Sequence, residues 1–138
     1  MVAKSSVDVL FQQCCDYNPR YAYLSDSVSA TLLRSQLKEA GSNTEVLSSN
    51  TDLLALCTAA EVDIVVAGIV GTAGLDPTLT AVRRGAIIAL ANKECLVSAG
   101  SILIEEVKKS NAKLIPVDSE HNAIFQVFEN DNKHSIDK

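Results

Sequence analysis

The sequence predicts an open α/β fold of the Rossmann type, with a parallel sheet and helices on both of its faces. Strand-like and helix-like segments alternate along the 138 residues. The strongest strand candidates, residues 62–67 and 86–91, are continuously apolar rather than alternating. Such runs are typical of strands that are covered on both faces in a parallel sheet. A third apolar run, residues 114–117, completes the set of strong strands.

The first half of the chain contains helices separated by shorter strands. The first helix has apolar residues at helical spacing and stops before Pro19, which disfavours helical backbone in the residue before it. The second helix starts at a capping residue near Asp26 and ends at Gly41. Its expected inward face includes Val28 and Leu32. In chain order we expect helix 7–17, strand 21–24, helix 25–40, strand 44–48 and helix 50–60.

The second half continues the alternation with the three strong strands. Asp76 followed by Pro77 is typical of an N-cap and a first helical position, and Gly85 closes that helix. The next helix is amphipathic, with Ile102 and Leu103 expected on its inward face. In chain order we expect strand 62–67, helix 77–84, strand 86–91, helix 98–110, strand 114–117 and helix 121–128.

Charge and composition exclude several classes of partner. The formal net charge is −5, which argues against nucleic acid or an anionic membrane surface as a partner. No apolar run approaches the ~20 residues of a membrane span, and the N-terminus lacks the apolar core of a secretory signal. The four cysteines have no metal-ligand spacing, so reduced thiols in the cytoplasm are expected.

Polar or glycine-rich runs follow each strong strand. They are residues 68–71, residues 92–94 and residues 118–120. In open parallel sheets, ligands bind outside the carboxyl ends of the strands, so these runs are expected at one edge. The glycine run is compatible with a plain turn or with close approach of a ligand. Lys93 and Glu94 are compatible with a solvated pair or with a site for a phosphorylated substrate.

The acidic run Asp118-Ser119-Glu120 has two interpretations. In extended backbone, residues two apart point to the same side, so both carboxylates could face one divalent cation such as magnesium or manganese. Alternatively, the run is a strand-to-helix turn in which Asp118 or Ser119 is the N-cap and Glu120 lies in the first turn. Spacing alone favours the cap and leaves the metal site open.

Four segments resemble the 1-deoxy-D-xylulose 5-phosphate reductoisomerase family. They are residues 90–97 (LANKECLV), 116–126 (PVDSEHNAIFQ), 67–75 (AGIVGTAGL) and 18–22 (NPRYA). The resemblance implies an enzyme that rearranges and reduces its phosphorylated sugar substrate to 2-C-methyl-D-erythritol 4-phosphate. It also implies NADPH, Mg²⁺ or Mn²⁺, and a role in non-mevalonate isoprenoid biosynthesis.

The resemblance implies roles for six residues. Asp118 and Glu120 match the metal carboxylates. Lys93, Ser119 and Glu120 match substrate-binding positions, and Lys93 and Glu120 are expected to be catalytic. Asn92 and Glu94 match positions at the NADPH site. His121 is given no catalytic role; it is expected to be a packed or hydrogen-bonded structural histidine.

The match also implies that the chain is a fragment. Residues 1–128 are expected to be a partial NADPH-binding domain that lacks its first, Gly-rich strand, and 129–138 a polar tail before a catalytic domain. Ser6 replaces an asparagine that the family often carries. The fragment alone is expected to be inactive, and the full-length protein to be a cytoplasmic or plastid-stromal homodimer.

Three other interpretations remain open. The chain could be a stand-alone nucleotide-binding or regulatory module without catalysis, or a structural remnant. It could also belong to another nucleotide-dependent oxidoreductase that acts on a phosphorylated sugar, which would share the cofactor but not the Asp-Ser-Glu metal site.

Overall fold

The computed structural model describes residues 1–128, and the predicted polar tail at 129–138 lies outside the described residues. The chain divides into two compact units, the first of which comprises Met1–Leu56 and the second of which begins at Cys57. Each unit contains a three-stranded parallel sheet with helices in the connections. The structure therefore confirms the predicted Rossmann-like α/β class, with the strands distributed over two sheets.

The first unit alternates strand and helix from its first residues, with strand order β1-β2-β3. The short strand β1 carries no recognisable pattern and was not predicted. Asp26 caps α2, where its carboxylate accepts a hydrogen bond from Ser29 N at 2.7 Å. The elements are β1 (Val2–Ala3), α1 (Val7–Tyr17), β2 (Tyr21–Leu24), α2 (Ser27–Glu39), β3 (Glu45–Leu47) and α3 (Asn50–Thr58), which crosses into the second unit.

The core of the first unit is aliphatic and forms where α1 and α2 meet the sheet. Leu33 and Leu37 of α2 are fully buried, as predicted. Val28 and Leu32 were also predicted to face inward, but they are 77% and 51% exposed. The apolar stripe of α2 is wider than the strip that its neighbours cover, so the prediction was wrong for these two residues.

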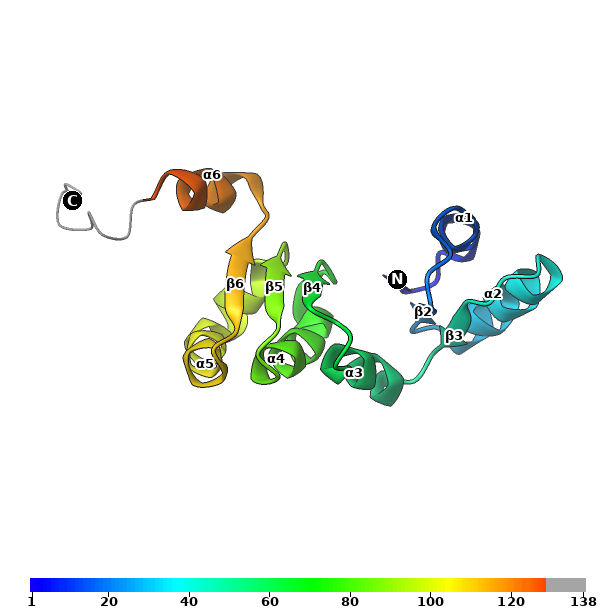
Figure 1. The fold of residues 1–138 in the computed structure, drawn as a ribbon, viewed down its shortest axis with the longest axis horizontal. Coiled ribbons are helices and arrows are strands. Elements are labelled where there is room, and N and C mark those ends of the chain that lie inside the picture. Colours follow the sequence, from blue (N-terminus) through cyan, green and yellow to red (C-terminus); the bar gives the residue numbers. More distant parts are fainter. Residues whose placement is uncertain (129–138) are drawn as a thin grey trace. The chain divides into compact units, whose positions relative to one another are not determined.

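The second unit contains the three strong strands, paired in the order β4-β5-β6 (Figure 1). The register pairs Ala67 with Leu90 and Leu90 with Pro116, so the three strands end level with one another. The elements are β4 (Ile64–Ala67), the 3₁₀ turn η1 (Gly71–Gly74), α4 (Leu75–Arg83), β5 (Ile87–Leu90), α5 (Glu94–Ser110), β6 (Lys113–Pro116) and α6 (Ser119–Val127).

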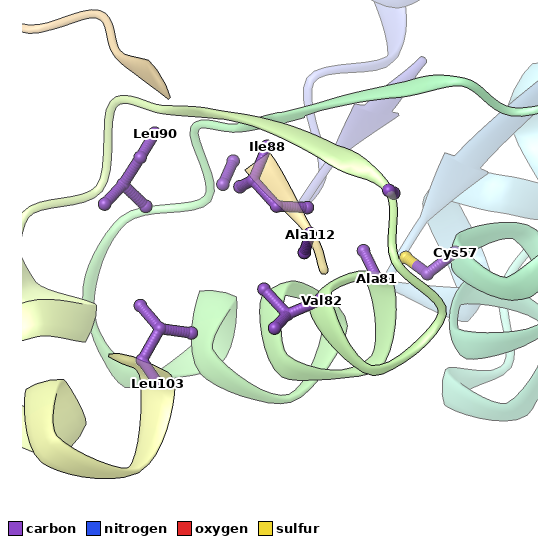
Figure 2. Packing of buried hydrophobic residues seen from close by; sticks show 9 residues of the cluster. Cys57, Ala81, Val82, Ile88, Leu90, Leu103 and Ala112 are labelled. Atoms are coloured by element: carbon purple, nitrogen blue, oxygen red, sulfur yellow. The ribbon is translucent and has the colours of Figure 1, made fainter. Parts of the chain in front are cut away.

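The core of the second unit lies between one face of this sheet and helices α4 and α5. Ile88 of β5, Val82 of α4 and Leu103 of α5 belong to one buried cluster, and none of them is exposed (Figure 2). Consecutive right-handed crossovers in one direction place both helices on the same face. On the opposite face of β4, Ile64 and Val66 are 57% and 70% exposed. Coverage of both faces, which the continuous apolar runs predicted, therefore does not hold at β4.

Three helix starts in this unit differ from the prediction. Helix α6 begins at Ser119 rather than at His121. Asp76 is not an N-cap, because the 3₁₀ turn runs directly into α4 and places Gly74 at the cap. Pro77 is tolerated there because the first turn of a helix leaves its N–H groups without intrahelical partners. Helix α5 starts at Glu94 rather than near Ser98, and it is interrupted by the non-helical backbone of Ala99 (φ −145°, ψ 28°).

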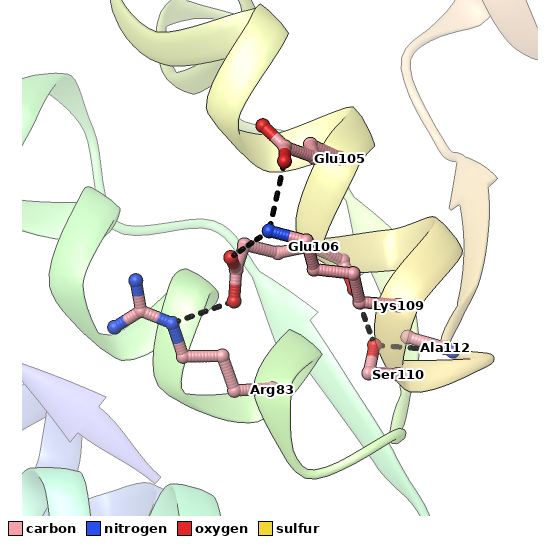
Figure 3. Close-up of polar contacts among 6 residues, drawn as sticks. All are labelled: Arg83, Glu105, Glu106, Lys109, Ser110 and Ala112. Carbon is pink, nitrogen blue, oxygen red and sulfur yellow. Dashed lines mark hydrogen bonds and ion pairs between the residues drawn. The ribbon is translucent and has the colours of Figure 1, made fainter.

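An ion-pair network links the exposed sides of α4 and α5 (Figure 3). Arg83 Nε donates to Glu106 Oε2 at 2.9 Å, and Lys109 Nζ lies 2.8 Å from Glu105 Oε1 and 3.7 Å from Glu106 Oε1. The Arg83 guanidinium holds the pKa of Glu106 below its ordinary value. Exposed ion pairs contribute little to stability, so the packing of α4 against α5 depends mainly on the buried cluster.

Within residues 1–128, no helix has the combination of length and apolar character that crossing a membrane requires.

We expect Leu103→Ala to destabilise the protein by about 2–5 kcal/mol, because it removes a fully buried side chain and leaves a cavity. Ile102 was also predicted to face inward, but it is 51% exposed, so that prediction was wrong. Ile102→Ala is therefore the matched control on the same helix, and its cost is expected to be about 1 kcal/mol or less. Urea unfolding of the two variants beside the parent protein measures the difference. Equal costs for the two substitutions would contradict the described core.

Candidate functional site

The site is built at the carboxyl edge of the sheet β4-β5-β6. Because the strands are parallel and end level, the segments that follow them emerge at the same edge (Figure 1). The glycine segment, residues 68–74, follows β4. Asn92-Lys93-Glu94 follows β5, and Asp118-Ser119-Glu120 follows β6. The structure thus brings the three predicted polar segments together at one edge.

A pocket of about 630 Å³ opens beside this edge. Its polar lining consists of Lys93, Asp118 and His121. The side chains of Asn92, Glu94, Ser119 and Glu120, which the sequence also singled out, are not among the lining residues. The remaining lining is apolar and comes from β5, β6, α5, α6 and the residue directly after α6. These residues are Leu90, Leu96, Leu114, Pro116, Ile124, Phe125 and Phe128.

Asp118 is the N-cap of α6. Its Oδ1 accepts a hydrogen bond from the backbone N–H of His121 at 3.1 Å and lies 2.6 Å from His121 Nδ1. These bonds, first the backbone N–H and then the ring, hold the pKa of Asp118 below its ordinary value, with a smaller contribution from Glu120. His121 is therefore hydrogen-bonded through its ring, as expected for a structural histidine, although its side chain is 60% exposed.

Glu120 lies in the first turn of α6, and its Oε2 accepts a hydrogen bond from Ser119 Oγ at 3.2 Å. The extended-backbone argument for a shared side of Asp118 and Glu120 is wrong, because the backbone becomes helical at Ser119. The two carboxylates nevertheless lie close in sequence, separated only by Ser119, at the N-cap and in the first turn of α6. Capping and metal binding are thus compatible interpretations of the same run.

The donor set for a cation is incomplete in the part of the chain that is described. Asp118 and Glu120 offer the carboxylate oxygens that Mg²⁺ and Mn²⁺ prefer. However, residues 1–128 contain no group of three or more His, Cys, Asp or Glu side chains that could hold a metal ion. The two carboxylates could supply part of such a site, in which the other ligands would be substrate oxygens, water or residues outside this range.

In the segment after β5, two exposed residues are flanked by two buried ones. Asn92 is 3% exposed and Cys95 is 1% exposed, while Lys93 and Glu94 between them are exposed. The Asn92 amide donates to carbonyls of the glycine segment. Sequence reasoning had not placed this amide inside the protein; Gly74, where a side chain would collide with it, is the signal that could have indicated it.

Fold and site together define a Rossmann-like α/β domain whose sheet edge carries a glycine segment, a lysine and a pair of carboxylates. Residues 1–100 match the family model of 1-deoxy-D-xylulose 5-phosphate reductoisomerase. The chain belongs to this family.

Solved structures of the family superpose closely on this chain. A crystal structure of DOX-P reductoisomerase in complex with magnesium, and one with NADPH, fosmidomycin and magnesium, are each 39% identical to it, with a TM-score of 0.88. Each match covers 94% of this chain and 32% of the other. The Zymomonas mobilis enzyme in complex with NADPH is 40% identical over 95% of this chain and 34% of its own, with a TM-score of 0.86. The chain thus spans about a third of these relatives.

We expect the pKa of the Asp118 carboxyl group to lie below its ordinary value of 3.8. In His121→Ala this pKa should be lowered by a smaller amount. That substitution removes the ring but keeps the backbone N–H, which is the larger cause of the lowered pKa. A lowered pKa means that the native state binds the proton more weakly than the unfolded state. The stability contributed by this cap is therefore complete above about pH 3.8 and is lost as the pH falls through the folded-state pKa.

Carboxyl-detected NMR titration measures both effects. Asp26, the N-cap of α2, is the internal control, because its pKa is lowered by Ser29 and is not expected to respond to His121→Ala. An Asp118 pKa at or above the ordinary value in the parent protein would show that the described cap does not form.

Proposed function

We propose that the chain is part of a 1-deoxy-D-xylulose 5-phosphate reductoisomerase. This enzyme converts 1-deoxy-D-xylulose 5-phosphate to 2-C-methyl-D-erythritol 4-phosphate in non-mevalonate isoprenoid biosynthesis. The observation that carries the proposal is 39% identity, over 94% of this chain, to a DOX-P reductoisomerase solved with NADPH, fosmidomycin and magnesium. Residues 1–128 would form part of the NADPH-binding domain.

We further propose that Asp118 and Glu120 supply carboxylate ligands to Mg²⁺ or Mn²⁺. Their position at the start of α6 suits this role, since Asp118 is oriented by its capping bonds and stays ionised at neutral pH. When bound, the cation supplies Lewis-acid stabilisation of substrate oxygens, and NADPH supplies the hydride. The protein's part is to hold these groups at the same sheet edge.

Lys93 and Ser119 are proposed to bind the substrate together with Glu120, with Lys93 and Glu120 as the catalytic residues. Lys93 is exposed and reaches the pocket from the start of α5, where its ammonium group can neutralise an anionic oxygen. Ser119 can donate from its hydroxyl at the N-terminus of α6, a helix end that favours negative charge. Asn92 and Glu94 are proposed to belong to the NADPH side of the site.

The cellular setting is also a proposal that rests on family membership. We propose a homodimer in the cytoplasm, or in the plastid stroma if the organism has plastids.

We expect Glu120→Gln and Lys93→Met each to lower the rate of NADPH-dependent turnover of 1-deoxy-D-xylulose 5-phosphate by at least about 100-fold, because each removes a charge at the reacting centre. The variants are made in the complete enzyme that contains this chain, and NADPH oxidation is followed. Glu120→Gln should also raise the Mn²⁺ concentration needed for half-maximal rate, whereas Lys93→Met should not.

Glu105→Gln and Lys108→Met are the matched controls, since both residues are exposed on α5 away from the strand ends. Their rates are expected to equal that of the parent. If the parent enzyme does not turn over this substrate with NADPH and a divalent cation, the proposed function is wrong.

A further inference from the structure

Helix α5 is divided into two parts. Ala99 has φ −145° and ψ 28°, which lie outside the helical region, so the helix consists of residues 94–98 and residues 100–110 on either side of a kink. Non-helical dihedrals at one residue interrupt the i→i−4 hydrogen-bond ladder, whose bonds across this point involve the amides of residues 100–103. We call residues 94–98 the arm and residues 100–110 the stem.

The sequence at the kink consists of small residues. Residues 98–101 are Ser-Ala-Gly-Ser, and kinks in helices are typical of Gly/Ser pairs. Neither packing nor backbone geometry requires glycine at position 100. A Cβ on Gly100 would meet no atom within 4 Å, and Gly100 is not one of the glycines with positive φ. Its remaining effect is to disfavour continuous helix at this position.

The arm and the stem are held by different contacts. In the stem, Leu103 belongs to the buried cluster, and Glu106 pairs with Arg83 of α4 (Figures 2 and 3). In the arm, the fully buried residue is Cys95. None of residues 96–102 is fully buried. The junction between the two parts therefore lacks the packing that would make them move as one.

The arm contributes to the pocket at the sheet edge. Leu96 lies in the arm and Lys93 directly precedes it, and both line the pocket. Other lining residues, among them Asp118 and Phe125, come from α6 and its N-cap. A tilt of the arm would therefore change the distance between Lys93 and Asp118, and with it the width of the pocket.

We propose that the arm is a movable wall of this pocket, which tilts about Ala99 and Gly100 when NADPH and the phosphorylated sugar bind. The stem stays fixed on α4 and the sheet. Hinges of this kind consist of a few residues, often small ones, that absorb the change in backbone angles. A ligand that contacts Lys93 better in one tilt than in another shifts the arm toward that position. This inference rests on the proposed function of the site.

Hydrogen–deuterium exchange in the complete enzyme tests the hinge. Relative to their intrinsic rates, the amides of residues 100–103 are expected to exchange at least about tenfold faster than those of residues 105–109, because the ladder is interrupted there. NADPH, Mn²⁺ and 2-C-methyl-D-erythritol 4-phosphate cannot react together, because this product is already reduced. Their addition should slow exchange in the first set and leave the second unchanged. Equal exchange of the two sets in the free enzyme would overturn the proposal.

Gly100→Ala acts on the hinge directly, since it favours continuous helix and the added methyl group has room. It is expected to slow exchange of residues 100–103 about fivefold in the free enzyme. It should also lower kcat/KM for the sugar phosphate by at least about fivefold, because a stiffened arm adjusts less to the ligand.

Ser101→Ala is the matched control, because Ser101 is exposed, lies in the same helix and does not line the pocket. It should leave kcat/KM unchanged. Parental kcat/KM in Gly100→Ala, or an equal loss in Ser101→Ala, would overturn the proposal. If Gly100→Ala does not fold, the response of the parent's residues 100–103 to bound ligand decides, and no response would be a refutation.

Failure of the hinge and failure of the proposed function are distinguishable. NADPH fluorescence shows whether the parent enzyme binds the cofactor, and a parent that neither binds NADPH nor turns over the sugar phosphate would refute the proposed function. The exchange difference between residues 100–103 and 105–109 in the free enzyme requires no activity. Its absence in an active parent would refute the hinge alone.

Discussion

Parallel pairing of β4, β5 and β6 is the constraint on which the site depends. The register joins Ala67 to Leu90 and Leu90 to Pro116, so the last residues of three strands are level. Each of the three polar segments begins one or two residues after these positions. A shift in register would displace one segment from the others, and the buried faces of the strands resist such a shift because it would turn apolar side chains toward solvent.

Each segment is then shaped by hydrogen bonds to its own neighbours. After β6, Asp118 ends the extended backbone and begins α6 by accepting from His121 N, which fixes the direction of the helix. After β5, the donors of Asn92 hold the glycine segment. Groups proposed to bind ligands, such as Lys93 and Ser119, therefore lie beside buried or capped residues that orient them.

The pocket beside the edge combines this polar rim with an apolar wall. Lys93 and Asp118 provide charges of opposite sign, while apolar residues of β5, β6, α5 and α6 form most of the remaining lining. The edge thus places a cationic and an anionic side chain beside one apolar surface.

The sequence by itself determined the alternation of elements, the three strong strands, the polar runs after them and the family. Local spacing and turn chemistry indicate the elements and the polar runs, whereas the resemblance of four segments indicated the family; the structure and the family model confirmed them. Only the tertiary structure decided which apolar residues are covered: Val28, Leu32, Ile64 and Val66 are exposed although their patterns placed them inside. It also decided that the Asn92 amide faces inward. Spacing shows which residues share a side of an element, whereas burial depends on neighbours distant in sequence.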